Sequence, residues 1–265
     1  MSRTMGGSVF RRWWFLGLMR DDAAPSRTDR RGQSKHDQEL LLREWEVLRD
    51  RLAAFAAERV TAAGDVLRAA ELQLPAEETA ARRSYLWALE AFEAAGRLLE
   101  DPADLPDLAA AAVLAERSVE RLAAAHAEHA HRRPAPPVVR CFYNPLHGPA
   151  AVQPSAGAAG AGRNGRTGKG DRIRQRQRTG ARQAAADRRP ACRDCRQAIL
   201  AGQTPDVLPA LVPAGATGRR SPAALVPYFA VPQQWSVWSA TGCGAYDDRA
   251  PALVLSGEYR RRRPH

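Results

Sequence analysis

The stretches Cys141-Phe-Tyr-Asn-Pro-Leu-His147 and Cys192-Arg-Asp-Cys195 each hold a pair of side chains that bind soft metal ions. Zinc takes four tetrahedral nitrogen and sulfur ligands, and structural zinc sites commonly join two such short-range pairs. The Cys-x-x-Cys spacing lets two thiolates bind one ion from a single turn, and residues 193–200 are expected to form a short helix whose positive end favours thiolates. The sequence therefore predicts a structural Zn²⁺ site formed by Cys141, His147, Cys192 and Cys195.

Other interpretations of these residues stay open. Cys141 can be a small buried hydrophobic residue and His147 a surface turn residue, since Cys-x5-His is wider than the usual zinc knuckle. The Cys-x-x-Cys pair can be two reduced thiols. A thioredoxin-like redox role is disfavoured because no βαβ pattern precedes the pair.

Two further features bear on metal binding. Cys243 lies between two glycines that suit a turn, and we expect its thiol to take no part in the site. His126 and His129 share a helical face at a spacing that suits metal ligands, but no carboxylate-histidine motif faces them from another helix. We expect these histidines to lie at a solvated helix end, near its negative dipole terminus.

The segment 36–133 is expected to form an antiparallel bundle or long hairpin of three amphipathic helices. Apolar residues at three- and four-residue spacing place the first helix between His36 and Pro75, the second at about 76–99 and the third at about 107–131. Short connections turn successive helices back on one another. The inward residues predicted for the first helix are Leu41, Trp45, Leu48, Leu52, Phe55, Ala62 and Val66, and those for the second are Tyr85, Leu89, Phe92, Gly96 and Leu99.

Residues 134–149 and 190–259 are predicted to form a small zinc-ribbon or treble-clef-like module, which makes the fold class α+β. A stiff proline-rich linker before residue 138 marks the boundary with the helices. We expect a strand at 226–231 and a short closing helix at 250–259. Aromatic residues concentrate in this region and are expected to form its core, with an exposed patch for a partner as the alternative. They are Tyr228, Phe229, Trp235, Trp238 and Tyr246.

The net charge of +11 is unevenly distributed along the chain. Residues 36–133 carry 12 Lys/Arg against 19 Asp/Glu, whereas residues 134–265 carry 20 against 7. Much of the excess lies in residues 150–189, which are rich in Gly, Ala, Arg and Gln and are expected to be a disordered basic insertion. Its residues 151–189 can contact nucleic-acid phosphates nonspecifically, although it lacks interleaved aromatics for base stacking. Residues 260–265 are a basic tail.

Residues 1–35 are expected to be a disordered leader. The apolar run within residues 10–20 is too short to span a bilayer, so membrane contact there is not expected, with a weak interfacial anchor as the alternative. Four cysteines, two of them in Cys-x-x-Cys, do not indicate a secreted disulfide scaffold. We therefore expect a cytoplasmic protein.

The set of motifs resembles a group of uncharacterised actinobacterial proteins that pair an alanine-rich helical half with a C-terminal cysteine-containing module. The resemblance covers residues 36–149 and 190–259 and is carried by the two ligand stretches, by Val226-Pro-Tyr-Phe229 and by Ser236-Val-Trp-Ser-Ala-Thr-Gly-Cys-Gly244. It implies this order of parts and no catalytic residue. The long insertion departs from the more compact modules of the group.

The sequence holds no pattern typical of an enzyme's active site. Pro190-Ala-Cys-Arg-Asp-Cys195 is similar to part of the zinc deaminase motif, but Pro149 stands where the catalytic glutamate would follow the histidine ligand. We expect a non-enzymatic interaction or scaffolding protein whose helical half binds a protein partner or a second copy. The alternatives are a nucleic-acid-associated protein and a metal-dependent hydrolase that uses His147 and the cysteines.

Overall fold

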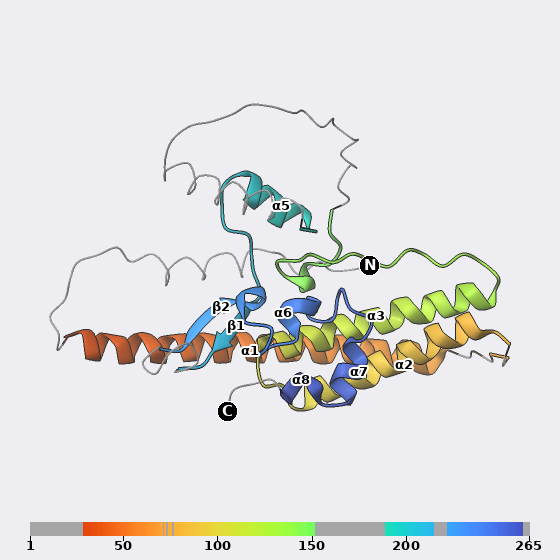
Figure 1. The fold of residues 1–265 in the computed structure, drawn as a ribbon, viewed down its shortest axis with the longest axis horizontal. Coiled ribbons are helices and arrows are strands. Elements are labelled where there is room, and N and C mark those ends of the chain that lie inside the picture. Colours follow the sequence, from red (N-terminus) through yellow and green to blue (C-terminus); the bar gives the residue numbers. More distant parts are fainter. Residues whose placement is uncertain are drawn as a thin grey trace, which may run out of the picture.

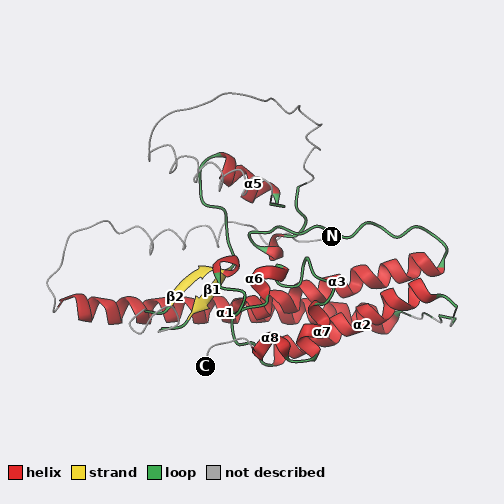
Figure 2. Cartoon of the chain, viewed as in Figure 1, coloured by secondary structure: helices red, strands yellow, loops and turns green. Residues whose placement is uncertain are grey.

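The computed structural model describes residues 29–70, 72, 74–75, 77–151, 189–214 and 222–261 (Figure 1). These residues are mostly helical, with one two-stranded antiparallel sheet (Figure 2). This content agrees with the predicted α+β class, while the zinc-ribbon or treble-clef type of module stays a prediction. Residues 1–28, residues 152–188 and the last part of the basic tail lie outside the described residues, so the predictions made for them are untested.

The three predicted helices are present and each runs antiparallel to its neighbour in sequence (Figure 1). They are α1 (Asp29–Ala69), α2 (Thr79–Glu100) and α3 (Leu105–His129). Helix α1 starts earlier than the predicted His36, within the segment expected to be leader. None of the helices in the described part of the chain combines the length and the apolar composition needed to cross a bilayer.

Helix α3 lies at the centre of the molecule. All its residues from Leu105 to Ala115 are buried, because α1, α2 and the C-terminal elements surround it. The large side chains Leu108 and Leu114 are fully buried, and each such burial contributes about 1.5–3 kcal/mol. The alanines between them let the neighbouring helices approach closely.

Helix α2 follows its predicted inward face only in part, since Phe92 and Leu99 pack against the core but are only partly buried. Its buried residues are mainly alanines together with Leu98, whereas Leu89, predicted to face inward, is exposed. Close packing of α2 against α3 places the smallest side chains at the helix contact. The larger apolar residues therefore lie at the flanks of that contact rather than in it.

Two carboxylates at the start of α3, the partly buried Asp104 and the buried Asp107, join distant elements. Asp104 caps the helix by accepting a hydrogen bond from the Leu105 amide (2.8 Å), and it also accepts from Trp45 Nε1 of α1 (3.0 Å) and from the Leu211 amide (3.0 Å). Asp107 accepts from Trp238 Nε1 at 2.6 Å. Buried polar groups require such partners, so the first turn of α3 fixes the positions of the elements around it.

The sheet consists of β1 (Pro209–Val212) and β2 (Ala224–Pro227), paired so that Pro209 faces Pro227 and Val212 faces Ala224. The strand predicted at 226–231 is wrong beyond Pro227, because the chain turns there into the 3-10 helix η3 (Tyr228–Ala230). The turn buries Tyr228 completely and lets its hydroxyl donate to the Phe142 carbonyl at 2.6 Å. Strand β2 therefore ends at Pro227, because the chain must change direction there to bury the ring of Tyr228.

The C-terminal elements pack on the helical bundle. They are α6 (Trp238–Thr241), α7 (Ala250–Leu255) and α8 (Glu258–Arg261); the single closing helix predicted at 250–259 is broken at Gly257, which has φ +73°. Tyr228 and Trp238 are the largest fully buried side chains. The alternative prediction, an exposed aromatic patch for a partner, is therefore wrong for these two residues. Residues from both sides of the predicted boundary share one hydrophobic core, and the boundary itself stays a prediction.

Candidate metal centre

The structure brings together the four residues that the sequence singled out. One ligand atom from each of Cys141, His147, Cys192 and Cys195 lies within 4.8 Å of all the others. The three cysteines are buried, and the imidazole of His147 is 22% exposed. The group can therefore bind a metal ion such as zinc, with three sulfur atoms and one nitrogen atom as ligands.

The first ligand pair lies on a turn closed by backbone pairing. The Cys141 amide donates to the Gly148 carbonyl (3.1 Å), and Arg140 pairs with Pro149 as an isolated antiparallel bridge. Inside the turn, η2 (Pro145–His147) brings His147 back toward Cys141. Gly148 has φ +79°, a region that glycine adopts without a steric penalty.

The second pair begins α5 (Arg193–Leu200), the short helix predicted after the Cys-x-x-Cys motif. Cys192 is the N-cap residue, and its sulfur accepts a hydrogen bond from the Cys195 amide at 3.4 Å. Unpaired amides at a helix start favour negative charge, which suits a thiolate ligand. Helix α5 lies apart from the helical bundle (Figure 1).

Backbone hydrogen bonds hold the two pairs against each other. The Phe142 amide donates to the Pro190 carbonyl (2.7 Å), and the Ala151 amide donates to the Ala191 carbonyl (2.8 Å). The ring centroids of Phe142 and Phe229 lie 4.9 Å apart, and both rings pack against the hydrophobic cluster that contains the three cysteines. The ligand atoms are thus brought together by main-chain and aromatic contacts of their own flanking residues.

A carboxylate that the sequence analysis missed contacts the histidine. Asp206 Oδ2 lies 3.1 Å from His147 Nε2, while His147 Nδ1 faces the sulfurs of Cys192 (3.5 Å) and Cys195 (3.3 Å). Burial lowers the pKa of His147, but its hydrogen bonds to Asp206 and to the cysteines raise the pKa to about 11. Asp206 is the only acidic residue between Arg196 and Leu208, and this was the one signal in the sequence that pointed to it.

The thiols influence one another strongly. Hydrogen bonds from Cys192 and Cys195 hold the pKa of Cys141 well below its usual range, while hydrogen bonds to the same neighbours raise the pKa of Cys195. The hydrogen bonds within the cluster thus favour ionisation of Cys141 over ionisation of Cys195. Metal ligands of this kind bind in deprotonated form, so a cation replaces protons when it binds.

The other sequence candidates lie elsewhere. Cys243 is fully buried in the main core, where burial raises the pKa of its thiol well above the usual value. His129 Nδ1 lies 2.6 Å from Glu78 Oε2. Across the described residues, neither His126 nor His129 belongs to a group of three or more ligands, and the Cys/His group above is the one such group found.

Comparison with known protein families, curated proteins and solved structures gave no match. The fold and the site define a mostly helical protein with a Cys/His group that can bind a metal ion. The resemblance to actinobacterial proteins stays a prediction. A proposal for the function therefore depends on the geometry of the Cys/His group.

Proposed function

We propose that the protein is a non-enzymatic interaction or scaffolding protein in which a structural zinc ion stabilises the region around α5. The observation that supports this most is the convergence of three cysteine sulfurs and one imidazole nitrogen within 4.8 Å. Catalytic zinc sites usually have three protein ligands and leave one position for water or substrate, whereas structural sites have four. Bound zinc would supply a cross-link between the 141–148 turn and the start of α5.

The small size of the local core supports the need for such a cross-link. Six buried residues make up the hydrophobic cluster at the site, and three of them are the ligand cysteines. Leu200, at the end of α5, is 75% exposed. So few apolar contacts do little to offset the entropy of ordering this region, and metal binding supplies folding free energy in domains of this kind.

Metal analysis of the purified, reduced full-length chain tests the proposal. We expect about one zinc ion per chain in the wild type, and loss of that zinc in Cys192→Ser/Cys195→Ser together with loss of order around α5. Cys243→Ala is the matched control, because it removes a buried thiol that lies outside the site. Freshly reduced wild-type protein that holds no metal while its C-terminal region stays folded would contradict the proposal.

The interaction role is supported by apolar residues on α1. Its N-terminal part extends beyond α2 and α3 (Figure 1), and Leu40 and Val47 are 45% and 51% exposed. These positions are one heptad apart and lie on a common helix face. This role is tested by sedimentation of the wild type and of Leu40→Lys/Val47→Lys over a range of concentrations, alone and with candidate partners. If the variant associates as the wild type does, this face of α1 is not the contact surface.

A nucleic-acid-associated protein is the second candidate. Arg189 and Arg193 are exposed where the chain returns from residues 152–188, a basic part of the sequence. Salt-dependent retention on nucleic acid that deletion of residues 152–188 abolishes would favour this candidate over a protein partner. A metal-dependent hydrolase ranks below both, because four protein ligands leave no open position for substrate.

A further inference from the structure

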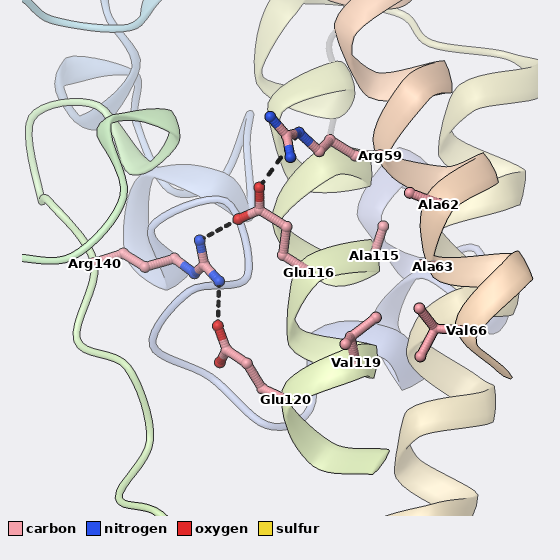
Figure 3. Close-up of a pocket in the computed structure, with 9 residues that line it drawn as sticks. All are labelled: Arg59, Ala62, Ala63, Val66, Ala115, Glu116, Val119, Glu120 and Arg140. Atoms are coloured by element: carbon pink, nitrogen blue, oxygen red, sulfur yellow. Dashed lines mark hydrogen bonds and ion pairs between the residues drawn. The ribbon is translucent and has the colours of Figure 1, made fainter. Parts of the chain in front are cut away.

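Arg140 immediately precedes the first metal ligand and sends its side chain away from the site, toward α3. Its side chain is 4% exposed, and the guanidinium forms ion pairs with Glu116 and with Glu120, the latter at 2.5 Å (Figure 3). Glu116 also pairs with Arg59 of α1 at 3.6 Å. One buried side chain thus links the ligand turn to two helices of the bundle.

The backbone of Arg140 belongs to the ligand turn itself. Arg140 pairs with Pro149 across the base of the turn, and its carbonyl accepts a hydrogen bond from the Tyr246 hydroxyl. The next residue, Cys141, is a ligand. A change in the position of the turn must therefore move Arg140, and withdrawal of Arg140 from α3 must disturb the turn.

Ionic contacts tie Arg140 to the helices, in addition to the apolar packing of Leu146 against the main core. Arg140 and the two glutamates lie at the edge of a shallow cavity of about 360 Å³ between α1 and α3. Apart from Arg59, the rest of the cavity lining is small and apolar, and it consists of Ala62, Ala63, Val66, Ala115 and Val119 (Figure 3). Because these side chains are short, the ion pairs between the guanidinium and the two carboxylates are the main contacts that hold Arg140 at the cavity.

We propose that Arg140 is a positioning residue for the metal centre, whose ion pairs with Glu116 and Glu120 couple metal binding to the docking of the ligand turn on α3. The inference rests on the proposed zinc site. A buried guanidinium without its carboxylates is strongly disfavoured, so the turn docks with both ion pairs formed or leaves α3. Coupling between two sites is reciprocal, so loss of the ion pairs weakens metal binding and metal removal loosens the docking.

Zinc affinity, measured on the full-length chain by competition with a chromophoric chelator, tests the coupling. We expect Arg140→Gln and Glu116→Gln/Glu120→Gln each to weaken zinc binding by about 5-fold or more. The triple variant should bind about as weakly as the weaker of these two, because both remove one shared interaction. Arg121 lies on α3, like the two glutamates, but it pairs with Asp248. Arg121→Gln therefore removes a nearby cation without touching the Arg140 ion pairs, and it should leave the zinc affinity unchanged.

The charge of Arg140 separates this coupling from a direct electrostatic effect. Loss of a cation near a bound cation would tighten zinc binding, whereas loss of the anchorage weakens it. Zinc binding in Arg140→Gln that equals or exceeds that of the wild type would overturn the inference. Arg140→Lys keeps the charge but lacks the planar fork that reaches two carboxylates, so it should fall between Arg140→Gln and the wild type.

Two further outcomes keep the inference distinct from the proposed function. If Arg140→Gln does not fold, the separate variants Glu116→Gln and Glu120→Gln leave every residue of the ligand turn in place, and unchanged affinity in both overturns the coupling. Wild-type protein that binds no zinc overturns the metal site and the coupling together. If the wild type binds zinc and the Arg140 and glutamate variants bind it equally tightly, the coupling alone is overturned.

Discussion

The carboxylate of Asp206 contacts the imidazole of His147 on the side opposite the cysteines, with 3.1 Å between Oδ2 and Nε2. An acceptor at this position holds the proton on Nε2, so Nδ1, on the side of the sulfur atoms, is the nitrogen that would lose its proton to bind a metal. Histidine ligands of zinc commonly have such a carboxylate partner, which fixes the ring and increases its basicity. Asp206 thus orients His147 for the role that the sequence analysis assigned to it.

Replacing Asp206 tests this orientation. We expect Asp206→Ala to weaken zinc binding by about 10–100-fold, because the imidazole loses the contact that fixes its tautomer and ring position. The measurement is competition for zinc with a chelator of known affinity. Asp194→Ala removes an exposed carboxylate from the first turn of α5 and should have a much smaller effect; equal losses in both variants would point to net charge as the cause.

Asp104 should make stability depend on pH in an unusual direction. Burial raises its pKa from 3.8 to about 6, against the opposing effect of its hydrogen bonds to Trp45, Leu105 and Leu211. The folded state then binds more protons than the unfolded state between these two values. The stability contributed by protonated Asp104 is therefore fully present below pH 3.8 and is lost as the pH rises through about 6.

Asp104→Asn isolates this contribution, since asparagine stays neutral and is also a good N-cap residue. Denaturant unfolding at a series of pH values should show the variant gaining free energy of unfolding relative to the wild type as the pH rises from 4 to 7. Asp247→Asn should show no such change over this range, because hydrogen bonding to Arg249 lowers the pKa of Asp247, so its contribution is lost only as the pH falls below 3.8. Parallel pH profiles for wild type and Asp104→Asn would refute the assignment.

Local patterns in the sequence were enough to predict the elements that depend on local physics. Proline and aspartate residues in the segment Asp101–Pro106 end one helix and start the next through the capping box at Asp104. The Cys-x-x-Cys motif predicted both a thiol pair and the short helix α5. These features arise between residues close together in the chain, so spacing and residue type determine them.

Contacts between distant residues could not be predicted in this way. The buried face of α2 follows from how closely α3 approaches it, and Ala88 and Ala91 carry no signal that distinguishes them from solvent-facing alanines. Asp206 reaches His147, and Arg140 reaches Glu116, only after the whole chain has folded. The sequence therefore predicted the four residues that can bind a metal ion, but neither the carboxylate that contacts one of them nor the arginine next to their turn.

The hydrogen bond from Trp238 to Asp107 should contribute strongly to stability. Trp238 is 1% exposed and its Nε1 lies 2.6 Å from Asp107 Oδ1. Trp238→Phe removes a donor from a buried carboxylate and leaves a cavity, so we expect a loss of about 3 kcal/mol in the free energy of unfolding. Trp45→Phe removes the equivalent donor from Asp104 at a less buried position and should cost less, as measured by urea unfolding of both variants.

Substitutions at two glycines with left-handed backbone conformations distinguish the cost of backbone strain from that of a steric clash. Gly242 ends α6 with φ +60°, and Gly257 lies between α7 and α8 with φ +73°. A Cβ atom at Gly242 would lie 2.4 Å from Cδ2 of Tyr246, whereas a Cβ at Gly257 would meet no atom within 4 Å. Only the first substitution therefore adds a clash to the unfavourable conformation.

Gly257→Ala should cost about 1–2 kcal/mol of stability, the penalty for a left-handed conformation in a residue with a side chain. Gly242→Ala should cost clearly more, because it also displaces Tyr246, whose hydroxyl donates to the carbonyl of Arg140. Since Arg140 adjoins the candidate ligand Cys141, Gly242→Ala should in addition weaken zinc binding, while Gly257→Ala should not. Urea unfolding and chelator competition on both variants measure the two effects, and equal behaviour in both assays would show that Tyr246 does not support the ligand turn.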